Sequence, residues 1–324
     1  MKNCIWFRND LRIADNASLI KACQGESVIA VYFFDPRHYA MGDFGFKKTE
    51  KYRGRFLIET MTELKDNLEN LNIPLYVFMD TPENVFPDLV QKYDIKTIYL
   101  QKEWTREETH ILDALVANLP AATKFVETYD QFLFHPEDIP FEQFSDIPKV
   151  YTHFRKICEK NAEVRAVIDS PKPMPTQNLK DNTTEIPNLN ALGLDNFETD
   201  SRTAFPFKGG EQQALQRVQG YFWNTEKLAS YKKTRNGLIG TDYSSKLSAW
   251  LANGSISPRT VYREVKDFEK QVNKNDSTYW LIFELIWRDY FKYVSLKHGS
   301  KIFQIGGILE KEYSWDNSDK AKDN

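Results

Sequence analysis

Short apolar runs alternate with longer amphipathic stretches through the first 130 residues of the chain. The runs with strand character lie at 3–7, 28–34, 75–79, 97–101 and 124–128. The helical stretches between them lie near 15–24, 47–71, 82–93 and 104–118. Runs such as IWF, VIAVYFF and TIYL are almost wholly apolar, which is typical of parallel strands buried on both faces. The alternation therefore predicts a doubly wound, Rossmann-like parallel sheet with helices on both faces.

The carboxyl ends of the strands are where such a sheet usually binds its ligands. The first strand runs directly into the segment RNDLR at 8–12, and no GxGxxG motif follows it. We therefore do not expect a dinucleotide at that turn. Within the segment, Asp10 and Arg12 are expected to form a buried structural pair that holds the turn.

The second half of the chain has a helical pattern and follows a long connector. Residues 169–206 contain five prolines, many Asn, Asp and Thr residues, and no sustained period. We therefore expect an α/β domain at 1–134, a connector with one short helix at 135–206, and a helical domain at 207–324. In the last of these, Ser257 and Pro258 predict a helix start, and Gly254 ends the helix before it.

Bulk composition narrows the classes of protein that the chain can belong to. With 41% hydrophobic and 27% charged residues it resembles a globular protein, and no apolar run is long enough to span a membrane. Three scattered cysteines, and five histidines outside ligand spacing, predict neither disulfides nor a metal site. No secretory signal begins the chain, so we expect a cytoplasmic protein, acting as a monomer.

Charge is distributed unevenly along the chain. Residues 201–324 carry 20 Lys and Arg against 14 Asp and Glu, whereas residues 1–200 carry 23 against 32. A polyanionic partner would therefore bind the second half. An ordinary solvated face explains the asymmetry equally well.

Residues 277–299 form the most strongly patterned helix of the sequence. Apolar and aromatic residues run through at least five turns, a Ser-Thr pair supplies a start signal, and a glycine supplies a stop. Glu284, Arg288 and Lys292 follow at intervals of four and therefore share one helix face. The aromatic residues around them are Trp280, Phe283, Trp287, Tyr290 and Phe291. Such a pattern most often belongs to a core helix, and the alternative is a pocket wall for a planar ligand.

Residues 241–248, TDYSSKLS, place hydroxyl groups at the start of an expected helix. Free N–H groups and the helix dipole make such an end an anion site, to which serine hydroxyls add neutral donors. Ordinary N-capping is the more common meaning of the pattern. The residues by themselves leave both interpretations open.

Three segments together resemble the photolyase/cryptochrome family. They are IWFRNDLRIADNASL at 5–19, YKKTRNGLIGTDYSSKLSAWLANGSISPR at 231–259, and STYWLIFELIWRDYFKYVSLKHG at 277–299. Their amino-acid sequences look most like those of the DASH branch of the cryptochromes, and the resemblance extends from residue 3 to about residue 310. It implies an α/β domain followed by an all-α FAD-binding domain. Family members continue through several more helices, so this second domain is expected to be incomplete at its C-terminal end.

The resemblance implies a set of FAD-binding residues. The contacts to the flavin phosphates would be Ser244, Ser245, Lys246, Leu247 and Ser248, with Tyr231 as a further phosphate or adenosine contact. Leu281, Glu284 and Arg288 would line the same site, with Arg288 on the phosphate or ribose side. Lys246 stands where many relatives have arginine, which keeps the charge but loses the planar fork.

The resemblance also implies a DNA substrate. Glu284 would hydrogen-bond a damaged pyrimidine pair, and Trp287 would stack on one of its flipped bases. Core packing is the alternative for Trp287. Lys232, Lys233 and Arg235 would contact the phosphate backbone, although solvated loop charge is the default for such a cluster.

A second chromophore is implied for the first half of the chain. DASH-type relatives carry a folate antenna, 5,10-methenyltetrahydrofolate, between the domains, held partly by acids that follow the fourth strand. In the segment QKEWTREE, Glu103 is the first candidate and Glu107 the second. Both could instead supply capping charge at the start of the helix expected at 104–118.

The implied activity is light-driven repair of cyclobutane pyrimidine dimers, best in single-stranded DNA, by a FAD enzyme of the deoxyribodipyrimidine photo-lyase class. The flavin would carry the redox chemistry, and the protein would position and shield it. A photosensory flavoprotein that signals without repair is the main alternative, and an inactive partial chain is another. The tryptophan relay of photolyases has no match here, since Trp315 in the polar segment 313–324 is the only tryptophan after Trp287.

Overall fold

The computed structural model describes residues 2–43, 45–314, 316, 318 and 319, so Trp315 lies outside the described residues. The first half contains a five-stranded sheet with the order β3-β2-β1-β4-β5, in which every pair of neighbours is parallel. The strands are β1 (Lys2–Trp6), β2 (Ser27–Phe33), β3 (Leu75–Phe78), β4 (Thr97–Gln101) and β5 (Lys124–Thr128). The five predicted strands are confirmed, the last two with unchanged bounds.

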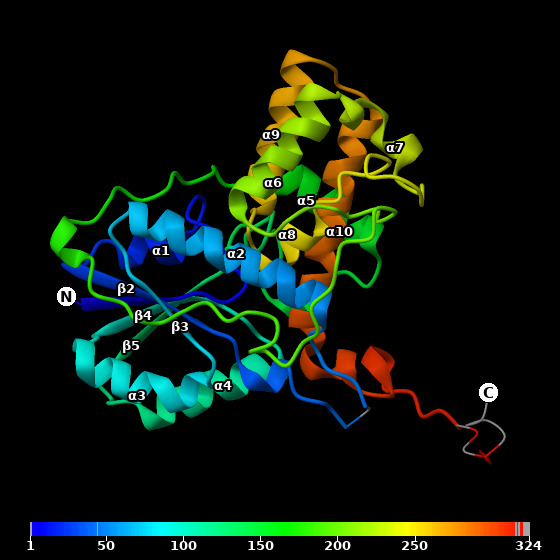
Figure 1. The fold of residues 1–324 in the computed structure, drawn as a ribbon. Coiled ribbons are helices and arrows are strands. Elements are labelled where there is room, and N and C mark those ends of the chain that lie inside the picture. The colour runs from blue at the N-terminus through cyan, green and yellow to red at the C-terminus, as the bar shows by residue number, and fades with distance from the viewer. Residues whose placement is uncertain (1, 44, 315, 317, 320–324) are drawn as a thin grey trace.

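Helices cover both faces of this sheet (Figure 1). On one face lie α1 (Ala17–Ala22) and α2 (Lys51–Asn70), and on the other lie α3 (Pro82–Tyr93) and α4 (Arg106–Asn118). Successive residues of β1 point to opposite faces: Ile5 joins the core under α1 and α2, and Trp6 joins the core under α3 and α4. The doubly wound architecture is therefore confirmed. The first helix is shorter than predicted because Asp15 has a left-handed φ of 52° and Asn16 caps the helix.

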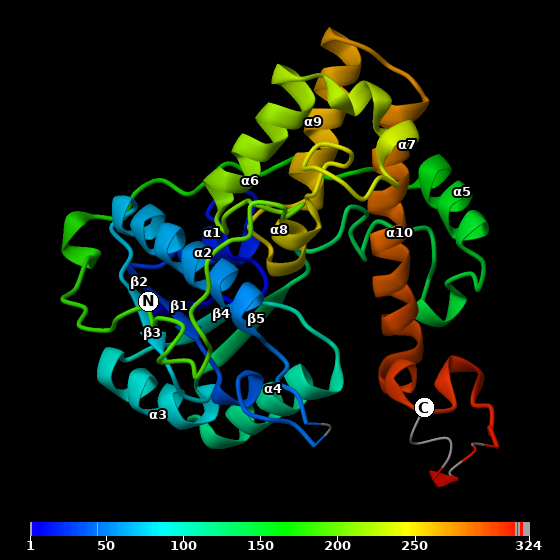
Figure 2. The same ribbon diagram turned by 45° about the vertical axis from the view of Figure 1, so that its right-hand side comes forward.

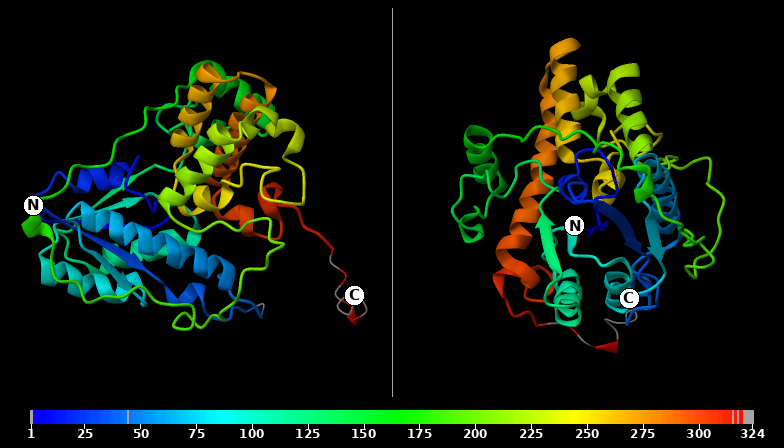
Figure 3. Two further views of the ribbon diagram at one scale, coloured as in Figure 1. Left: turned by 45° about the horizontal axis from the view of Figure 1, so that its top comes forward. Right: turned by 90° about the vertical axis from the view of Figure 1, so that its left-hand side faces the viewer.

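The second half of the chain is helical, and α10 (Asp276–His298) is its central element (Figure 2). The other helices are α5 (Tyr151–Asn161), α6 (Glu211–Val218), α7 (Tyr231–Thr234), α8 (Ser248–Asn253) and α9 (Pro258–Gln271). α5 lies on the side of α10 that faces away from the sheet (Figures 2 and 3). Among the described residues, no helix combines the length and apolarity needed to cross a membrane, and no cluster of His, Cys, Asp and Glu could hold a metal ion.

The helix ends follow the predicted signals with two differences. Ser257 caps α9, and Gly254, with a φ of 76°, ends α8. At the start of α10, however, the cap is Asn275, whose side chain accepts hydrogen bonds from the N–H groups of the Ser-Thr pair. The second difference is that α6 does not end at a stop signal but continues directly into a π turn at Gln219–Asn224.

The predicted connector packs against both halves of the molecule. Its first part contributes Tyr151 and Phe154 to the core around α10. Its later part contributes Leu189 and Leu194 to the core between the sheet and α2. The connector therefore belongs to two hydrophobic cores and ties them together.

A buried ion cluster joins the two halves. The guanidinium of Arg259 on α9 lies 2.8 Å from Asp15 Oδ1 and 3.1 Å from Asp130 Oδ1. Arg12 donates to the carbonyl oxygen of Asp15 (2.6 Å) and, across the interface, to that of Gly254 (2.9 Å). All of these residues are buried. Because each charge has an opposite charge or several hydrogen bonds, the cluster can remain ionised inside the protein.

Asp10 and Arg12 are both buried, as predicted, but they bond to different groups. Asp10 accepts from the backbone N–H of Arg8 (2.8 Å) and from Asn16 Nδ2 (3.4 Å). Burial raises the pKa of Asp10 to about 6, although the hydrogen bond from the Arg8 N–H and the charge of Arg12 both lower it. Arg12 takes backbone carbonyls as its partners because they surround its fork on three sides. The expected pair is therefore corrected: Asp10 and Arg12 form no ion pair with each other, and the Asn16 amide, which donates to Asp10 and to the Arg12 carbonyl oxygen, links them at the same turn.

Replacing Arg259 with Met should destabilise the whole chain. The variant leaves Asp15 and Asp130 buried without the guanidinium that pairs with both, and removing one partner of a buried ion pair costs about 3–5 kcal/mol. Equilibrium unfolding in urea measures the loss. Arg263→Met is the control on the same helix, because its pair with Glu264 is half exposed and should contribute only about 0–1 kcal/mol. Equal losses in the two variants would contradict the assignment of the cluster as the joint.

Candidate functional site

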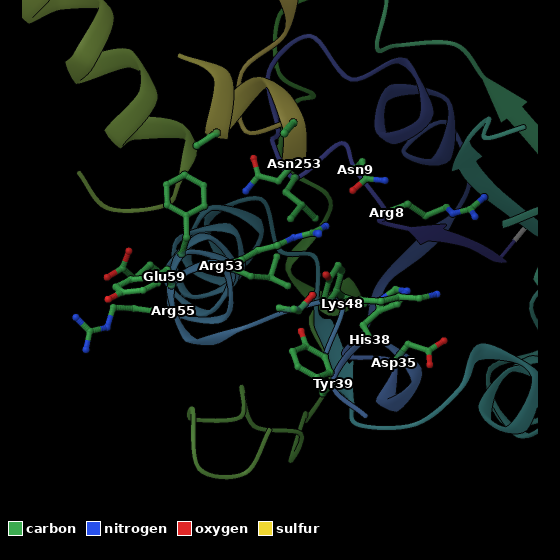
Figure 4. Close-up of a pocket in the computed structure, with 18 of the residues that line it drawn as sticks. Arg8, Asn9, Asp35, His38, Tyr39, Lys48, Arg53, Arg55, Glu59 and Asn253 are labelled. Carbon is green, nitrogen blue, oxygen red and sulfur yellow. The ribbon is translucent and has the colours of Figure 1, made fainter. Parts of the chain in front are cut away.

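A cavity of about 1390 Å³ opens at the carboxyl ends of β1 and β2 (Figure 4). Arg8 and Asp35 follow the two strands, and Arg53 lies on α2. Phe205 from the connector and Asn253 from the end of α8 also line the cavity. The cavity lies at the edge of the sheet where ligands were expected, and it exceeds the ~300–1,000 Å³ of ordinary small-molecule sites.

Two arginines of the cavity have no hydrogen bond or ion pair through their side chains within the described part of the chain. Arg8 packs over the Trp6 ring, with its guanidinium carbon 5.0 Å from the ring centroid. Arg53 lines the same space, and Lys48 beside it is neutralised by Glu107 at 2.6 Å. An aromatic lining with uncompensated cations suits a planar ligand that carries an anionic group.

The two acids predicted for the antenna lie on different surfaces. Glu107 is in the first turn of α4 and lines the cavity, and its bond to Lys48 lowers its pKa. Glu103 precedes the helix and accepts hydrogen bonds from Asn9 Nδ2 (3.2 Å) and Gln101 Nε2 (2.8 Å). It is not among the residues that line the cavity. Sequence spacing alone could not show this separation.

Lys292 of α10 lies at the contact between the two halves, near Glu103. Its ammonium is 5.3 Å from the ring centroid of Trp104 and 5.9 Å from that of Phe132. Burial lowers the pKa of Lys292 to about 8. The charge of Arg288 lowers it further, whereas that of Glu103 raises it. No hydrogen bond or ion pair to another described residue holds this amine.

Residues 241–247 form a loop, which corrects the predicted helix start. α8 begins only at Ser248, Leu247 is its cap residue, and no side chain makes a capping hydrogen bond. Lys246 has a φ of 62°, a left-handed conformation that interrupts a helix. Of the predicted phosphate contacts, the buried ones are Ser245 and Leu247, and those with exposed atoms are Ser244, Lys246 and Ser248.

Arg217 of α6 holds this loop, and sequence reasoning missed it. Its guanidinium donates to the carbonyl oxygens of Ser244 and Ser245, both at 2.9 Å, and to Asp242 Oδ1 at 2.8 Å. Nothing in the pattern of α6 marks this arginine, because its partners lie more than twenty residues further along the chain.

Tyr231 connects the loop to α10. Its hydroxyl interacts with Ser245, and burial together with the nearby charge of Glu284 raises the pKa of Tyr231 to about 12. Within the described part of the chain, the hydroxyls of Ser244 and Ser248 make no hydrogen bond. They are therefore free to donate to phosphate oxygens. A set of neutral donors beside the long helix α10 fits the pyrophosphate of a flavin dinucleotide.

The partly exposed side of α10 carries Glu284 and Trp287. Glu284 Oε1 lies 2.9 Å from Arg235 Nη1. The ring of Trp287 stacks on Tyr151 with centroids 3.5 Å apart, and it also stacks on Phe291 at 5.3 Å. These contacts agree with the packing alternative for Trp287. The side chain nevertheless keeps part of its surface exposed, so base stacking by Trp287 stays a prediction.

Leu281 and Arg288 face the interior of the helical half. Leu281 is buried. Arg288 donates to the carbonyl oxygens of Leu251 (3.0 Å) and Gln131 (2.5 Å), and burial lowers its pKa. These bonds hold α10 against α8 and against the segment that follows the sheet. Contact of either residue with a flavin stays a prediction.

The predicted basic cluster is only partly neutralised. Lys232 Nζ lies 3.1 Å from Asp276 Oδ2 and 4.6 Å from the ring centroid of Trp280. Arg235 is engaged by Glu284, as described above. Lys233 is exposed and has no side-chain bond to another described residue. The cluster therefore keeps at least one charge available for a polyanion.

Comparison with known proteins agrees with this arrangement. The model of the DNA photolyase family matches residues 3–177, which is more than half of the chain. A cryptochrome DASH of Gloeobacter violaceus is 42% identical over 313 residues, which cover 96% of this chain and 62% of the relative. The crystal structure of a Synechocystis cryptochrome superposes with a TM-score of 0.92 at 39% identity, covering 100% of this chain and 67% of that one.

A more distant structure shows the fold alone. An archaeal photolyase from Sulfolobus tokodaii, described with two FAD molecules, has a TM-score of 0.69 at 20% identity, covering 100% of this chain and 66% of its own. The chain belongs to the photolyase/cryptochrome family, whose members bind FAD. Within that family it is similar to the cryptochromes of DASH type. It spans about three fifths of the length of the curated relatives it matches.

The charge of Lys292 should make stability depend on pH. Because the folded state holds the pKa near 8, below the ordinary value of 10.5, folding disfavours the ammonium form. The penalty is full below pH 8 and disappears as pH rises from 8 towards 10.5. Lys292→Met should therefore be more destabilising at pH 9.5 than at pH 7, as measured by urea unfolding. The control Lys270→Met removes an exposed side chain on α9 and should have the same effect at both pH values. A pH-independent effect of Lys292→Met would contradict the assignment.

Proposed function

We propose that this chain carries flavin- and DNA-binding residues of a blue-light FAD flavoprotein of cryptochrome DASH type, which repairs cyclobutane pyrimidine dimers in single-stranded DNA. The observation that carries the proposal is the loop 241–248, which presents unbonded hydroxyls beside α10 within a chain that belongs to the photolyase/cryptochrome family. When bound, FAD supplies the photoexcited electron that splits the dimer. The chain's own residues bind, orient and shield it.

The FAD phosphates bind the loop and the residues next to it. Ser244 and Ser248 donate their free hydroxyls, and Lys246 adds a positive charge. Tyr231 closes the adenosine side, where its ring is already fixed by burial. These contacts come from neutral donors and one cation, which together match a dianionic pyrophosphate.

The damaged strand binds along the exposed side of α10 and the neighbouring basic cluster. Glu284 accepts hydrogen bonds from the pyrimidine edge, and Trp287 offers its open surface to a flipped base. Lys233 and Lys232 contact the phosphates, which strengthens binding without reading sequence. Glu284 is engaged by Arg235, so binding of the lesion exchanges an ion pair for hydrogen bonds.

An antenna chromophore binds the first half of the chain. A folate such as 5,10-methenyltetrahydrofolate bound at Glu103 would lie against Lys292 and Trp104, between the two halves. The cavity at the ends of β1 and β2 is a second candidate site for the antenna, because Arg8 and Arg53 supply cations for its anionic tail. The Sulfolobus tokodaii photolyase is described with two FAD molecules. A second flavin is therefore an alternative to folate as the antenna.

A photosensory protein that signals without repair is the alternative. It would use the same flavin site, so only turnover of a dimer separates the two functions. For either function we propose a cytoplasmic monomer.

Purification of residues 1–324 tests the flavin site directly. The described residues supply the phosphate loop and one side of α10, and neighbouring apolar side chains such as Leu238, Ile239 and Phe291 are exposed. We therefore expect measurable but weak binding, with FAD lost in gel filtration. A chain extended to the length of its relatives should retain FAD and repair dimers under blue light. Retention without repair would favour the photosensory alternative, and no binding by either chain would contradict the proposal.

Trp287→Ala should weaken binding to a dimer-containing single strand by about 5- to 150-fold, the range for loss of one stacked base. Glu284→Ala should weaken it by about 10-fold or more, because hydrogen bonds to a charged group are lost. Binding to the undamaged strand should change much less, because phosphate contacts are kept. Fluorescence anisotropy with the two strands measures both affinities. Tyr52→Ala, which removes an exposed aromatic ring of α2, is the control and should alter neither. Equal losses on both strands would mean that Glu284 and Trp287 only pack.

A further inference from the structure

Arg217 occupies a buried contact between α6 and the loop 241–247. Its side chain is 7% exposed. The guanidinium carbon lies 4.7 Å from the ring centroid of Phe207 and 4.8 Å from that of Tyr221. Two aromatic contacts hold the planar group in one orientation and favour its charge.

The acceptors of this guanidinium are spread over a short stretch of the loop. Nε donates to Ser245 O at 2.9 Å, Nη1 to Asp242 Oδ1 at 2.8 Å, and Nη2 to Thr241 O at 3.1 Å and Ser244 O at 2.9 Å. Three of the four acceptors are backbone carbonyls. Their dipoles converge on one point, where they would repel one another without a cation. The shape of the loop therefore depends on Arg217.

The direction of these carbonyls decides where the next N–H groups point. In a planar trans peptide, the N–H of each residue points opposite to the carbonyl of the residue before it. The carbonyls of Ser244 and Ser245 face Arg217, so the N–H groups of Ser245 and Lys246 face away from it. Within the described part of the chain, these two N–H groups make no hydrogen bond. Successive free N–H groups of this kind form a concavity for an anion.

A small charge network lies beneath the loop. Asp242 Oδ2 is 2.6 Å from Lys227 Nζ, and the bonds from Lys227 and Arg217 lower the pKa of Asp242 to about 2. Two cations and one ionised carboxylate leave one net positive charge behind the free N–H groups. The network therefore favours a negative ligand on the outer side of the loop.

We propose that Arg217 is a positioning residue for FAD, which shapes the loop 241–248 into a pyrophosphate site without touching the cofactor. The inference rests on the proposed function. It assigns the pyrophosphate to the side of the loop that faces away from Arg217.

Two variants of Arg217 and one control test this assignment in residues 1–324. Arg217→Gln removes the charge and most of the donors, and Arg217→Lys keeps the charge but cannot reach all four acceptors. Val218→Ala is the matched control, because Val218 is the next buried residue of α6 and makes no bond to the loop. Circular dichroism verifies that each variant is folded.

The first readout uses the protein without FAD. Trypsin cuts after Lys246 only when the loop opens, so Arg217→Gln should speed this cleavage about 10-fold or more, with Arg217→Lys between it and wild type. The second readout is affinity by flavin fluorescence. Arg217→Gln should weaken FAD binding about 10-fold or more and leave riboflavin, which has no phosphate, little changed.

The outcomes separate the inference from the function on which it rests. If the wild-type chain binds FAD, and if Arg217→Gln and Val218→Ala bind it with the same affinity, the role of Arg217 is overturned while the proposed function stands. Equal losses for FAD and riboflavin would also overturn it, because the effect would then not involve the phosphates. No FAD binding by the wild-type chain, even when extended to the length of its relatives, would refute the proposed function and the inference together.

Discussion

The ion cluster between Arg259, Asp15 and Asp130 is the contact on which the arrangement of the two halves depends. Asp15 sits in a left-handed turn just before α1, so its carboxylate belongs to the α/β half, whereas Arg259 is placed by the first turn of α9. Charges buried in this way tolerate little displacement, because separation would leave each of them unpaired in a medium of low dielectric. The relative orientation of the cavity, the loop 241–248 and α10 is therefore set by a few atoms at this joint.

Three arginines tie segments together that lie far apart in the sequence. Arg12, Arg217 and Arg288 all donate to backbone carbonyls of a segment distant in sequence. Guanidinium suits this task because it stays protonated when buried and offers donors in a rigid plane. Lysine is used differently here: the amine of Lys292 is desolvated without a bonded partner, which lowers its pKa and leaves it available to a ligand.

Local patterns predicted the elements better than they predicted the site. The strands were predictable because buried parallel strands are continuous apolar runs, and α10 because its aromatic period is long. The prediction of a helix start at 241–248 was wrong. Lys246 takes a left-handed conformation there, and Arg217, which is distant in sequence, bonds to the loop. Glu103 and Glu107 were grouped by their spacing, yet α4 begins between them and places them on different surfaces. The cavity is lined from seven separate segments, and no local signal could have assembled it.

Repair and signalling make different demands on the same scaffold, and the difference is confined to one side of α10. Both need the joint at Arg259 and the loop held by Arg217, since both need a fixed flavin. Only repair needs Glu284 to leave Arg235 and accept bonds from a pyrimidine edge, because the phosphate contacts of a strand cannot distinguish damaged bases from intact ones. The Glu284–Arg235 pair is therefore the place where the two proposed functions differ, and it is separate from the residues proposed to hold the cofactor.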